Sequence, residues 1–262
     1  MAVPVQPDAK SFRVPELTLA SDVPLDRLAE RRDLFRNLDR AIGTSSESRS
    51  SPSSRYADQA FDLLASPSAR AAFDIGRENP KTRDSYGRTQ FGQSCLLARR
   101  LVEAGVGLVH VNWFRGAEEP SDAPCWDSHA REAARLKTVL APVADRAIAG
   151  LLADLADRGM LESTLVMCLA EFGRTPKFNR AAGRDHWGHV FSVALAGGGV
   201  RGGIVHGSSD KNGAYPKEGR VSAQDITATA LHCLGFEPHS EIRDTLNRPF
   251  PASRGEVIRA IL

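Results

Sequence analysis

The order of apolar runs in the second half of the chain does most to limit the folds that it can adopt. A β-branched run over residues 106–113 is followed by a long helical pattern over residues 129–158 and then by a second strand-like run over residues 164–170. Strand, helix and strand in this order are typical of a βαβ unit, whose two strands run parallel. Two further short strands are predicted at residues 191–196 and 203–206. The sequence therefore predicts an α/β fold in which helices flank a mostly parallel sheet.

Further helices are predicted before and after these strands. They cover residues 25–42, 56–64, 67–75, 89–104 and 222–234. Gly105, Gly159 and Gly235 follow three of the helical patterns and are expected to end those helices in the left-handed conformation. Pro142 lies inside the long helical pattern and is expected to kink that helix or divide it in two.

The chain is expected to consist of two regions. Residues 43–55 are polar and Ser-rich, and they lack the apolar side chains that a core requires, so they are predicted to form a mobile loop. Residues 1–86, which include this loop, are predicted to be helical and partly disordered. Residues 87–262 are predicted to form an α/β core that holds the candidate site.

The composition argues against several classes of protein. Lys and Arg total 34 and Asp and Glu total 32, for a formal net charge of +2, so we expect no nucleic-acid binding and no attraction to a membrane surface from bulk charge. No apolar run reaches the roughly 20 residues of a membrane-spanning helix. The start of the chain does not resemble a secretory signal peptide. The four cysteines are scattered without a C-x-x-C spacing, which predicts neither a zinc knuckle nor a disulfide framework.

Acidic and histidine side chains gather where the predicted strands end. Asp127 and His129 lie on the loop after the first strand, and Glu171 directly follows the second. Asp185 and His186 lie on the loop that leads into the third strand. Since the carboxyl ends of parallel strands meet at one edge of a sheet, we expect these five side chains to converge there. Two imidazoles and three carboxylates form a mixed nitrogen and oxygen ligand set, which suits Zn²⁺, Mn²⁺ or a similar divalent ion.

Two further side chains near this edge have chemistry to contribute. Arg174 offers a planar guanidinium that matches a phosphate or sulfate oxyanion. His189 is close enough in sequence to Asp185 and His186 to act as a proton donor or metal ligand, or to hydrogen-bond a metal ligand without contacting the metal. Some of the candidate residues also have purely structural interpretations. Asp127 is a candidate N-cap of the following helix, and Glu171 with Arg174 is a candidate ion pair.

The sequence gives no evidence for a dinucleotide site or for a serine nucleophile elbow. Residues 197–202 match G-x-G-x-x-G, but the pattern continues as a strand instead of opening a helix. They therefore predict a hairpin turn and not a dinucleotide site. The chain also has no G-x-S-x-G nucleophile elbow.

Several short segments together resemble the DUF1501 proteins, a sulfatase-like bacterial family that is abundant in planctomycetes and lies within the alkaline phosphatase-like superfamily. The segments are residues 91–105, 126–129, 171–176, 183–187 and 195–203. They occur in the order expected of the family, and the resemblance extends over roughly residues 9–250. It implies an alkaline phosphatase-like or sulfatase-like fold.

The resemblance also implies an activity. Members of this superfamily are metal-dependent hydrolases of phosphate or sulfate esters, which implies a small-molecule or glycan ester as substrate and Zn²⁺, Mn²⁺, Ca²⁺ or Mg²⁺ as cofactor. Asp127 and His129 correspond to the ligand pair after one strand, and Glu171 corresponds to the acid at the end of the next. A further histidine ligand corresponds to His186 or His189.

The chain departs from the superfamily pattern in two respects. The superfamily usually has an Asp-His pair where this chain has Glu171 and Phe172, so an alternative alignment places that pair on Asp185 and His186. Members are also usually much longer, with an export signal, a first metal-binding acid and the nucleophile in their N-terminal half. By this resemblance the chain is the C-terminal portion of a longer protein or the product of a truncated gene. Its sheet would then lack the first strands and expose an edge through which the chain can associate.

Two hypotheses follow from the sequence. The leading one is a metal-dependent hydrolase domain for sulfate or phosphate esters, incomplete because the nucleophile is not identified in this chain. The alternative is a non-catalytic metal-binding or interaction module that is a remnant of such an enzyme. The resemblance leaves the cellular location open, because the relatives are typically exported whereas this chain shows no signal peptide.

Overall fold

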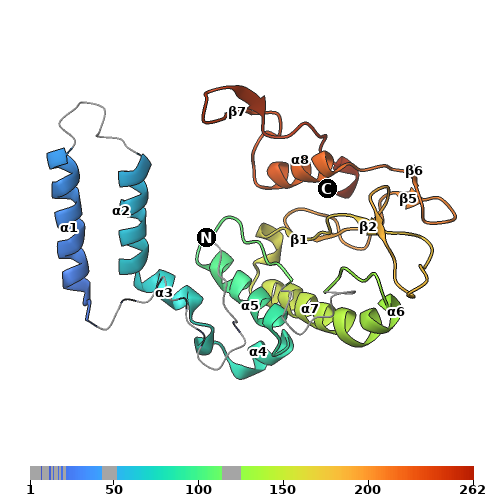
Figure 1. Ribbon diagram of the computed structural model, residues 1–262, viewed down its shortest axis with the longest axis horizontal. Coiled ribbons are helices and arrows are strands. Elements are labelled where there is room, and N and C mark those ends of the chain that lie inside the picture. Colours follow the sequence, from blue (N-terminus) through green and yellow to red (C-terminus); the bar gives the residue numbers. More distant parts are fainter. Residues whose placement is uncertain are drawn as a thin grey trace. The chain divides into compact units, whose positions relative to one another are not determined.

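The computed structural model of the chain consists of helices and short two-stranded ribbons (Figure 1). It describes residues 22–42, 52–113 and 125–262, together with single positions before them. These positions are Pro7, Phe12, Val14, Leu17 and Leu19. The chain divides into two compact units, residues 1–112 and residues 113–262, and each unit is described by itself.

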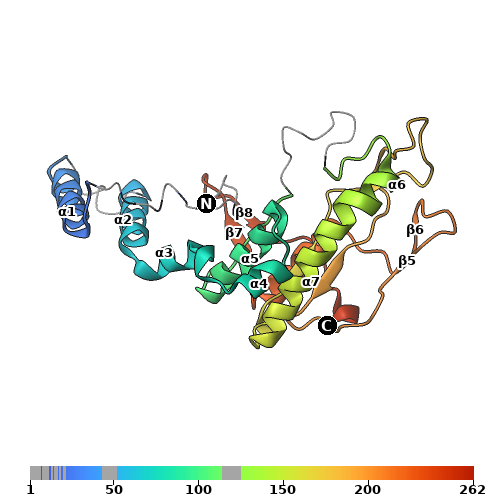
Figure 2. The ribbon, with the colours of Figure 1, turned by 90° about the horizontal axis from the view of Figure 1, so that it is seen from below.

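The described part of the first unit is mostly helical. Phe35 of the first helix and Phe61 of the second place their ring centroids 6.4 Å apart, and Arg32 forms ion pairs with Asp58 and Asp62. These contacts hold the first two helices side by side (Figures 1 and 2). The helices of this unit are α1 (Leu25–Ile42), α2 (Pro52–Ala65), α3 (Pro67–Phe73), η3 (Ile75–Arg77), α4 (Pro80–Ser85) and α5 (Gln90–Glu103).

The last residues of the segment predicted to be a Ser-rich loop belong to a helix. Residues 43–51 of this segment lie outside the described residues, but α2 already begins at Pro52, so the last part of residues 43–55 is helical. Proline suits this position, because the first turn of a helix has no intrahelical partner for its N–H groups. The other helices predicted for this unit are confirmed, and Ser66 caps α3 by accepting a hydrogen bond from Ala69 N at 3.1 Å.

The glycines predicted to end helices do so. Gly105, Gly159 and Gly235 all have positive φ, from 67° to 92°. At the end of α5, Gly105 N donates to Val102 O and Val106 N donates to Leu101 O, which is the hydrogen-bond pattern of a Schellman motif.

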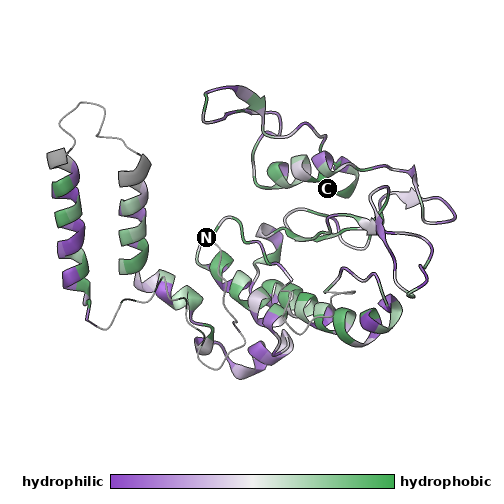
Figure 3. Ribbon diagram, viewed as in Figure 1, coloured by the Kyte–Doolittle hydropathy of each residue, from purple (hydrophilic) through white to green (hydrophobic). Residues whose placement is uncertain are grey.

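The helices of the second unit follow the predicted pattern but are divided. A π-helical turn precedes Pro142, and α7 begins just before this proline, as the sequence predicted. Figure 2 shows α6 and α7 in one continuous line, and α7 is mostly hydrophobic in Figure 3. The helices are α6 (Glu132–Arg135), the π-helix η4 (Leu136–Leu140), α7 (Ala141–Asp157), η5 (Leu161–Ser163), α8 (Ala223–Cys233) and η6 (Arg259–Ile261). None of the helices within the described part of the chain is long and apolar enough to cross a lipid bilayer.

Among the described residues the strands form four antiparallel ribbons, each with two strands. The fold is therefore a mixture of helices and small sheets, but the predicted parallel sheet is not found among the described residues. The pairs are β1 (Val166–Cys168) with β4 (Ala194–Ala196), β2 (Gly173–Arg174) with β3 (His186–Trp187), β5 (Ser208–Ser209) with β6 (Pro216–Glu218), and β7 (Glu241–Arg243) with β8 (Pro249–Pro251).

The parallel pairing fails because one of its two strands does not form. Residues 106–113 have no strand structure, and Leu108 within them is 79% exposed. A β-branched run favours a strand only where neighbouring strands and a core accept its side chains. The second predicted strand is present as β1, but its partner is β4, which follows β1 in the chain and runs back beside it. The strand predicted at residues 203–206 is also not formed.

Candidate metal centre

The ribbon of β2 and β3 brings two functional side chains together. In its antiparallel register Arg174 lies opposite His186, and Gly173 lies opposite Trp187. Because side chains alternate between the two faces of a strand, Arg174 and His186 share one face, and Trp187 belongs to the other. Phe172 shares the face of His186, with a ring-centroid distance of 4.2 Å.

A second set of backbone contacts brings the segment before α6 to this ribbon. Ala130 and Ala182 form an isolated antiparallel bridge, and Arg184 N donates to Ser128 O at 3.1 Å. The two segments approach closely at Gly183, where a Cβ atom would lie 2.0 Å from the carbonyl carbon of His129. Only a residue without a side chain fits there, so the Gly183 of the sequence motif has a steric role.

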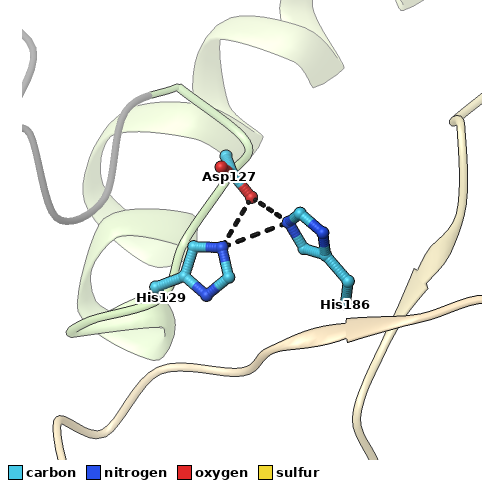
Figure 4. Close-up of side chains that lie close together, drawn as sticks. All are labelled: Asp127, His129 and His186. Atoms are coloured by element: carbon cyan, nitrogen blue, oxygen red, sulfur yellow. Dashed lines mark hydrogen bonds and ion pairs between the residues drawn. The ribbon is translucent and has the colours of Figure 1, made fainter.

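Three donor atoms converge where these segments meet. His129 Nε2 lies 3.1 Å from His186 Nε2 and 3.1 Å from Asp127 Oδ1, and His186 Nε2 lies 2.8 Å from Asp127 Oδ1 (Figure 4). Within the described part of the chain, these three residues are the set of His, Cys, Asp or Glu side chains whose donor atoms all lie within 4.8 Å of one another. We refer to Asp127, His129 and His186 as the three-donor centre.

The three-donor centre fits a transition-metal ion. Ligand atoms at about 2.0–2.2 Å from one tetrahedral ion lie roughly 3.3–3.6 Å apart, which is close to the separations found here. Two imidazole nitrogens and one carboxylate oxygen suit Zn²⁺ or a similar ion better than Ca²⁺ or Mg²⁺, which prefer oxygen ligands throughout. The three side chains are 37–49% exposed, so an ion can reach them from solvent.

Asp185 lies behind this centre and not within it. Its Oδ1 is 3.0 Å from His129 Nδ1, the ring nitrogen that faces away from the other donors. Hydrogen bonds from His129 and Asn179 lower the pKa of Asp185, so at neutral pH the carboxylate only accepts hydrogen bonds. His129 Nδ1 must therefore donate, so in the neutral ring Nε2 keeps its lone pair, which is directed at the centre. Carboxylates orient the ring of metal-binding histidines in this way.

A hydrogen bond from His186 connects two of the three metal-binding atoms. Because a carboxylate oxygen cannot donate, the 2.8 Å contact between His186 Nε2 and Asp127 Oδ1 requires the proton to be on His186. His129 Nε2 lies 3.1 Å from the same His186 nitrogen and, in its neutral form, is a second acceptor. A cation bound to the three donors would replace this proton, since ligating imidazoles must be deprotonated at the ligating atom.

Arg174 is paired with the same carboxylate. Its Nη2 donates to Asp127 Oδ1 at 2.6 Å and to Trp126 O at 3.0 Å. Partial burial acts to raise the pKa of Asp127, but hydrogen bonds from Arg174 and His186 outweigh that effect and lower it to about 2. Asp127 is consequently ionised across the physiological range and available as an anionic ligand.

The remaining predicted site residues lie elsewhere. Glu171 is exposed and does not belong to the three-donor centre. His189 packs against Trp187 and Tyr215, with ring centroids 4.7 Å and 4.9 Å away, so it belongs to an aromatic cluster on the other side of the ribbon. The structure thus brings together three of the five predicted ligands and places Asp185 directly behind one of them.

Two supporting residues were not identified from the sequence. Asn179 donates to His129 O and to Asp185 Oδ1, and Thr175 Oγ1 accepts a hydrogen bond from Asp185 N at 3.1 Å. Both lie in the connection between β2 and β3. The asparagine four residues before Gly183 is a local signal for an Asx turn, but nothing in its spacing reveals the contact with His129.

Comparison with known proteins gives a family but no characterised relative. The sequence model of DUF1501, described as a protein of unknown function, matches residues 1–262. The match therefore includes the first 86 residues as well as the segments that form the centre. No curated protein and no solved structure matches the chain.

Proposed function

We propose that this chain, which belongs to the DUF1501 family, binds a divalent metal ion through the three-donor centre and acts in the hydrolysis of sulfate or phosphate esters. The observation that carries the proposal is the convergence of Asp127 Oδ1, His129 Nε2 and His186 Nε2 within 3.1 Å of one another at an exposed position. Exposed ion pairs add little to stability, so stability alone does not account for this arrangement.

The donor count supports hydrolytic chemistry. Catalytic zinc sites commonly use three protein ligands and keep further positions open, whereas structural sites are closed by four. A bound ion supplies Lewis acidity and lowers the pKa of a bound water molecule. Arg174 has the planar donors that recognise a phosphate or sulfate oxyanion, and its guanidinium already lies against Asp127. The sulfatase-like superfamily is part of this proposal and rests on the sequence motifs alone, since the ribbons observed are antiparallel.

Metal binding is the first test. Isothermal titration of the metal-free chain with Zn²⁺, Mn²⁺, Mg²⁺ and Ca²⁺ should show one site that prefers Zn²⁺ or Mn²⁺. His186→Ala and Asp127→Ala should each abolish that binding. His206→Ala is the matched control, because His206 is exposed and lies outside the three-donor centre, and it should bind like the wild type. A wild-type chain that binds none of these ions would refute the proposal.

Ester turnover is the second test. Hydrolysis of an aryl phosphate and an aryl sulfate is measured with the metal-free and the metal-loaded chain. Metal-dependent turnover that is lost in His186→Ala supports the hydrolase. Stoichiometric metal without turnover of either ester would instead support the alternative, a non-catalytic metal-binding module, because the donors would then be present without the nucleophile.

A further inference from the structure

We propose that Asn179 is a positioning residue that sets the metal affinity of the three-donor centre by holding Asp185 and the backbone of His129 together. The inference rests on the proposed metal binding and adds a residue that touches none of the three donor atoms. It is carried by the position of one side chain amide between two segments that are about 50 residues apart in the sequence.

The amide of Asn179 is fully used. Its Nδ2 donates to His129 O at 2.9 Å and to Asp185 Oδ1 at 3.2 Å. Its Oδ1 accepts from Ala181 N at 2.9 Å and from Gly183 N at 3.0 Å. An asparagine amide offers two donor hydrogens and two acceptor lone pairs, so all four have partners. The oxygen shapes the turn, and the nitrogen joins that turn to the metal-binding segment.

The nitrogen contacts both members of the His129–Asp185 pair. It holds the histidine by its backbone and the aspartate by its carboxylate, so it fixes the two groups relative to each other. Asp185 needs this support, because its side chain is 57% exposed and water competes for its oxygens. Its main chain is fixed independently, since Thr175 N donates to Asp185 O at 2.9 Å.

Loss of Asn179 affects metal binding by changing which nitrogen of His129 carries the proton. A neutral imidazole can carry its proton on either nitrogen, and a carboxylate at Nδ1 selects the form with a free lone pair at Nε2. When Asn179 is removed, the Asp185 carboxylate gains rotational freedom, and its hydrogen bond with His129 Nδ1 weakens. Part of the population then carries the proton on Nε2, where a metal ligand cannot have one.

The experiment is a double-mutant cycle on zinc affinity, measured by competition with a chelator. Asn179→Ala and Asp185→Asn should each weaken zinc binding by about tenfold, the lower end of the effect of removing groups that orient metal ligands. The double variant should be no weaker than the weaker single variant, because the two residues act in one chain of contacts. Asn212→Ala, at an exposed asparagine in another turn, should leave the affinity unchanged.

A second variant separates positioning from folding of the turn. Asn179→Asp keeps the oxygen that accepts from Ala181 N and Gly183 N but removes both donors. Its added negative charge by itself would strengthen the binding of a cation. A fall in zinc affinity therefore supports positioning, and an unchanged or higher affinity contradicts it.

The proton position on His129 gives a readout that does not need the metal. Nitrogen-15 NMR of the metal-free wild type should show His129 protonated at Nδ1, and Asn179→Asp should show a mixture of both forms. Equal spectra, or zinc affinities that combine additively in the cycle, would overturn the role of Asn179 while leaving the metal site intact. A wild type that does not bind zinc would overturn both this inference and the proposed function.

Discussion

Two clusters in this protein each combine acidic with basic side chains, but they differ in construction. The α5 ion cluster, in the first unit, consists of Glu78, Arg99, Arg100 and Glu103. Arg99 Nη2 lies 2.8 Å from Glu78 Oε1, its Nη1 lies 2.5 Å from Glu103 Oε2, and Arg100 also binds Glu78. The side chain of Arg99 is 0% exposed. The three-donor centre, in the second unit, is 37–49% exposed.

The difference lies in which atoms face each other. In the α5 ion cluster each carboxylate faces arginine N–H groups, so donors meet acceptors and opposite charges are matched. In the three-donor centre, two imidazole nitrogens and one carboxylate oxygen converge on one point, and Arg174 pairs with the carboxylate from one side only. Such an arrangement has a place for a cation. Matched and buried charges indicate a structural role, whereas converging lone pairs at the surface indicate a binding site.

The largest effect is expected in the α5 ion cluster. Arg99→Ala leaves Glu78 partly buried with one arginine fewer, and removing one partner of a buried pair typically costs about 3–5 kcal/mol. Urea unfolding followed by far-UV circular dichroism, which reports the helices, measures the loss. The zinc affinity of the folded protein should not change. A loss below about 1 kcal/mol would show that this cluster behaves like an exposed pair and would remove the contrast.

The next effect is expected at the three-donor centre. In Gly183→Ala the new Cβ would lie 2.0 Å from the carbonyl carbon of His129, so residues 129–130 must move and the donors must separate. We expect zinc affinity to fall by about 10- to 100-fold, as for other changes that misplace metal ligands. Chelator competition measures the change.

Gly188 provides the matched control for this substitution. It lies five residues further along, and a Cβ at this position would meet nothing within 4 Å. Gly188→Ala should therefore keep the wild-type affinity. If both alanine variants lost zinc equally, the close approach at Gly183 would not be what holds the donors together.

The sequence predicted features that depend on near neighbours better than features that depend on distant segments. Helix ends, such as those at Gly105, Gly159 and Gly235, depend on neighbours a few residues away and were predicted correctly. The donors Asp127 and His186 were expected to meet at the edge of a parallel sheet, and they do lie together, although the described residues form antiparallel ribbons instead. The antiparallel pairing of β1 with β4 was missed, because it depends on which distant segment supplies a partner. Asn179 was missed for the same reason.

A smaller effect concerns pH. Partial burial acts to raise the pKa of Glu78, but hydrogen bonds from Arg99 and Arg100 outweigh that effect, so its pKa in the folded protein lies below the ordinary 4.5. The unfolded chain therefore takes up a proton first as the pH falls, and stability that is present above pH 4.5 is lost below it. Urea unfolding between pH 6 and pH 3.5 should show this decline. Glu78→Gln should be less stable at neutral pH and should decline less, and an equal decline would mean that other carboxylates are responsible.

The smallest effect is expected where charges are matched but exposed. Arg88 and Asp84 form an ion pair of 2.6 Å with both side chains about half exposed. Such a pair combines the donor–acceptor matching of the α5 ion cluster with the exposure of the three-donor centre. Arg88→Ala should change the free energy of unfolding by at most about 0.5 kcal/mol, and salt should reduce that change further. Urea unfolding at low and high salt measures it. A loss comparable to that of Arg99→Ala would show that matching alone, without burial, stabilises the first unit.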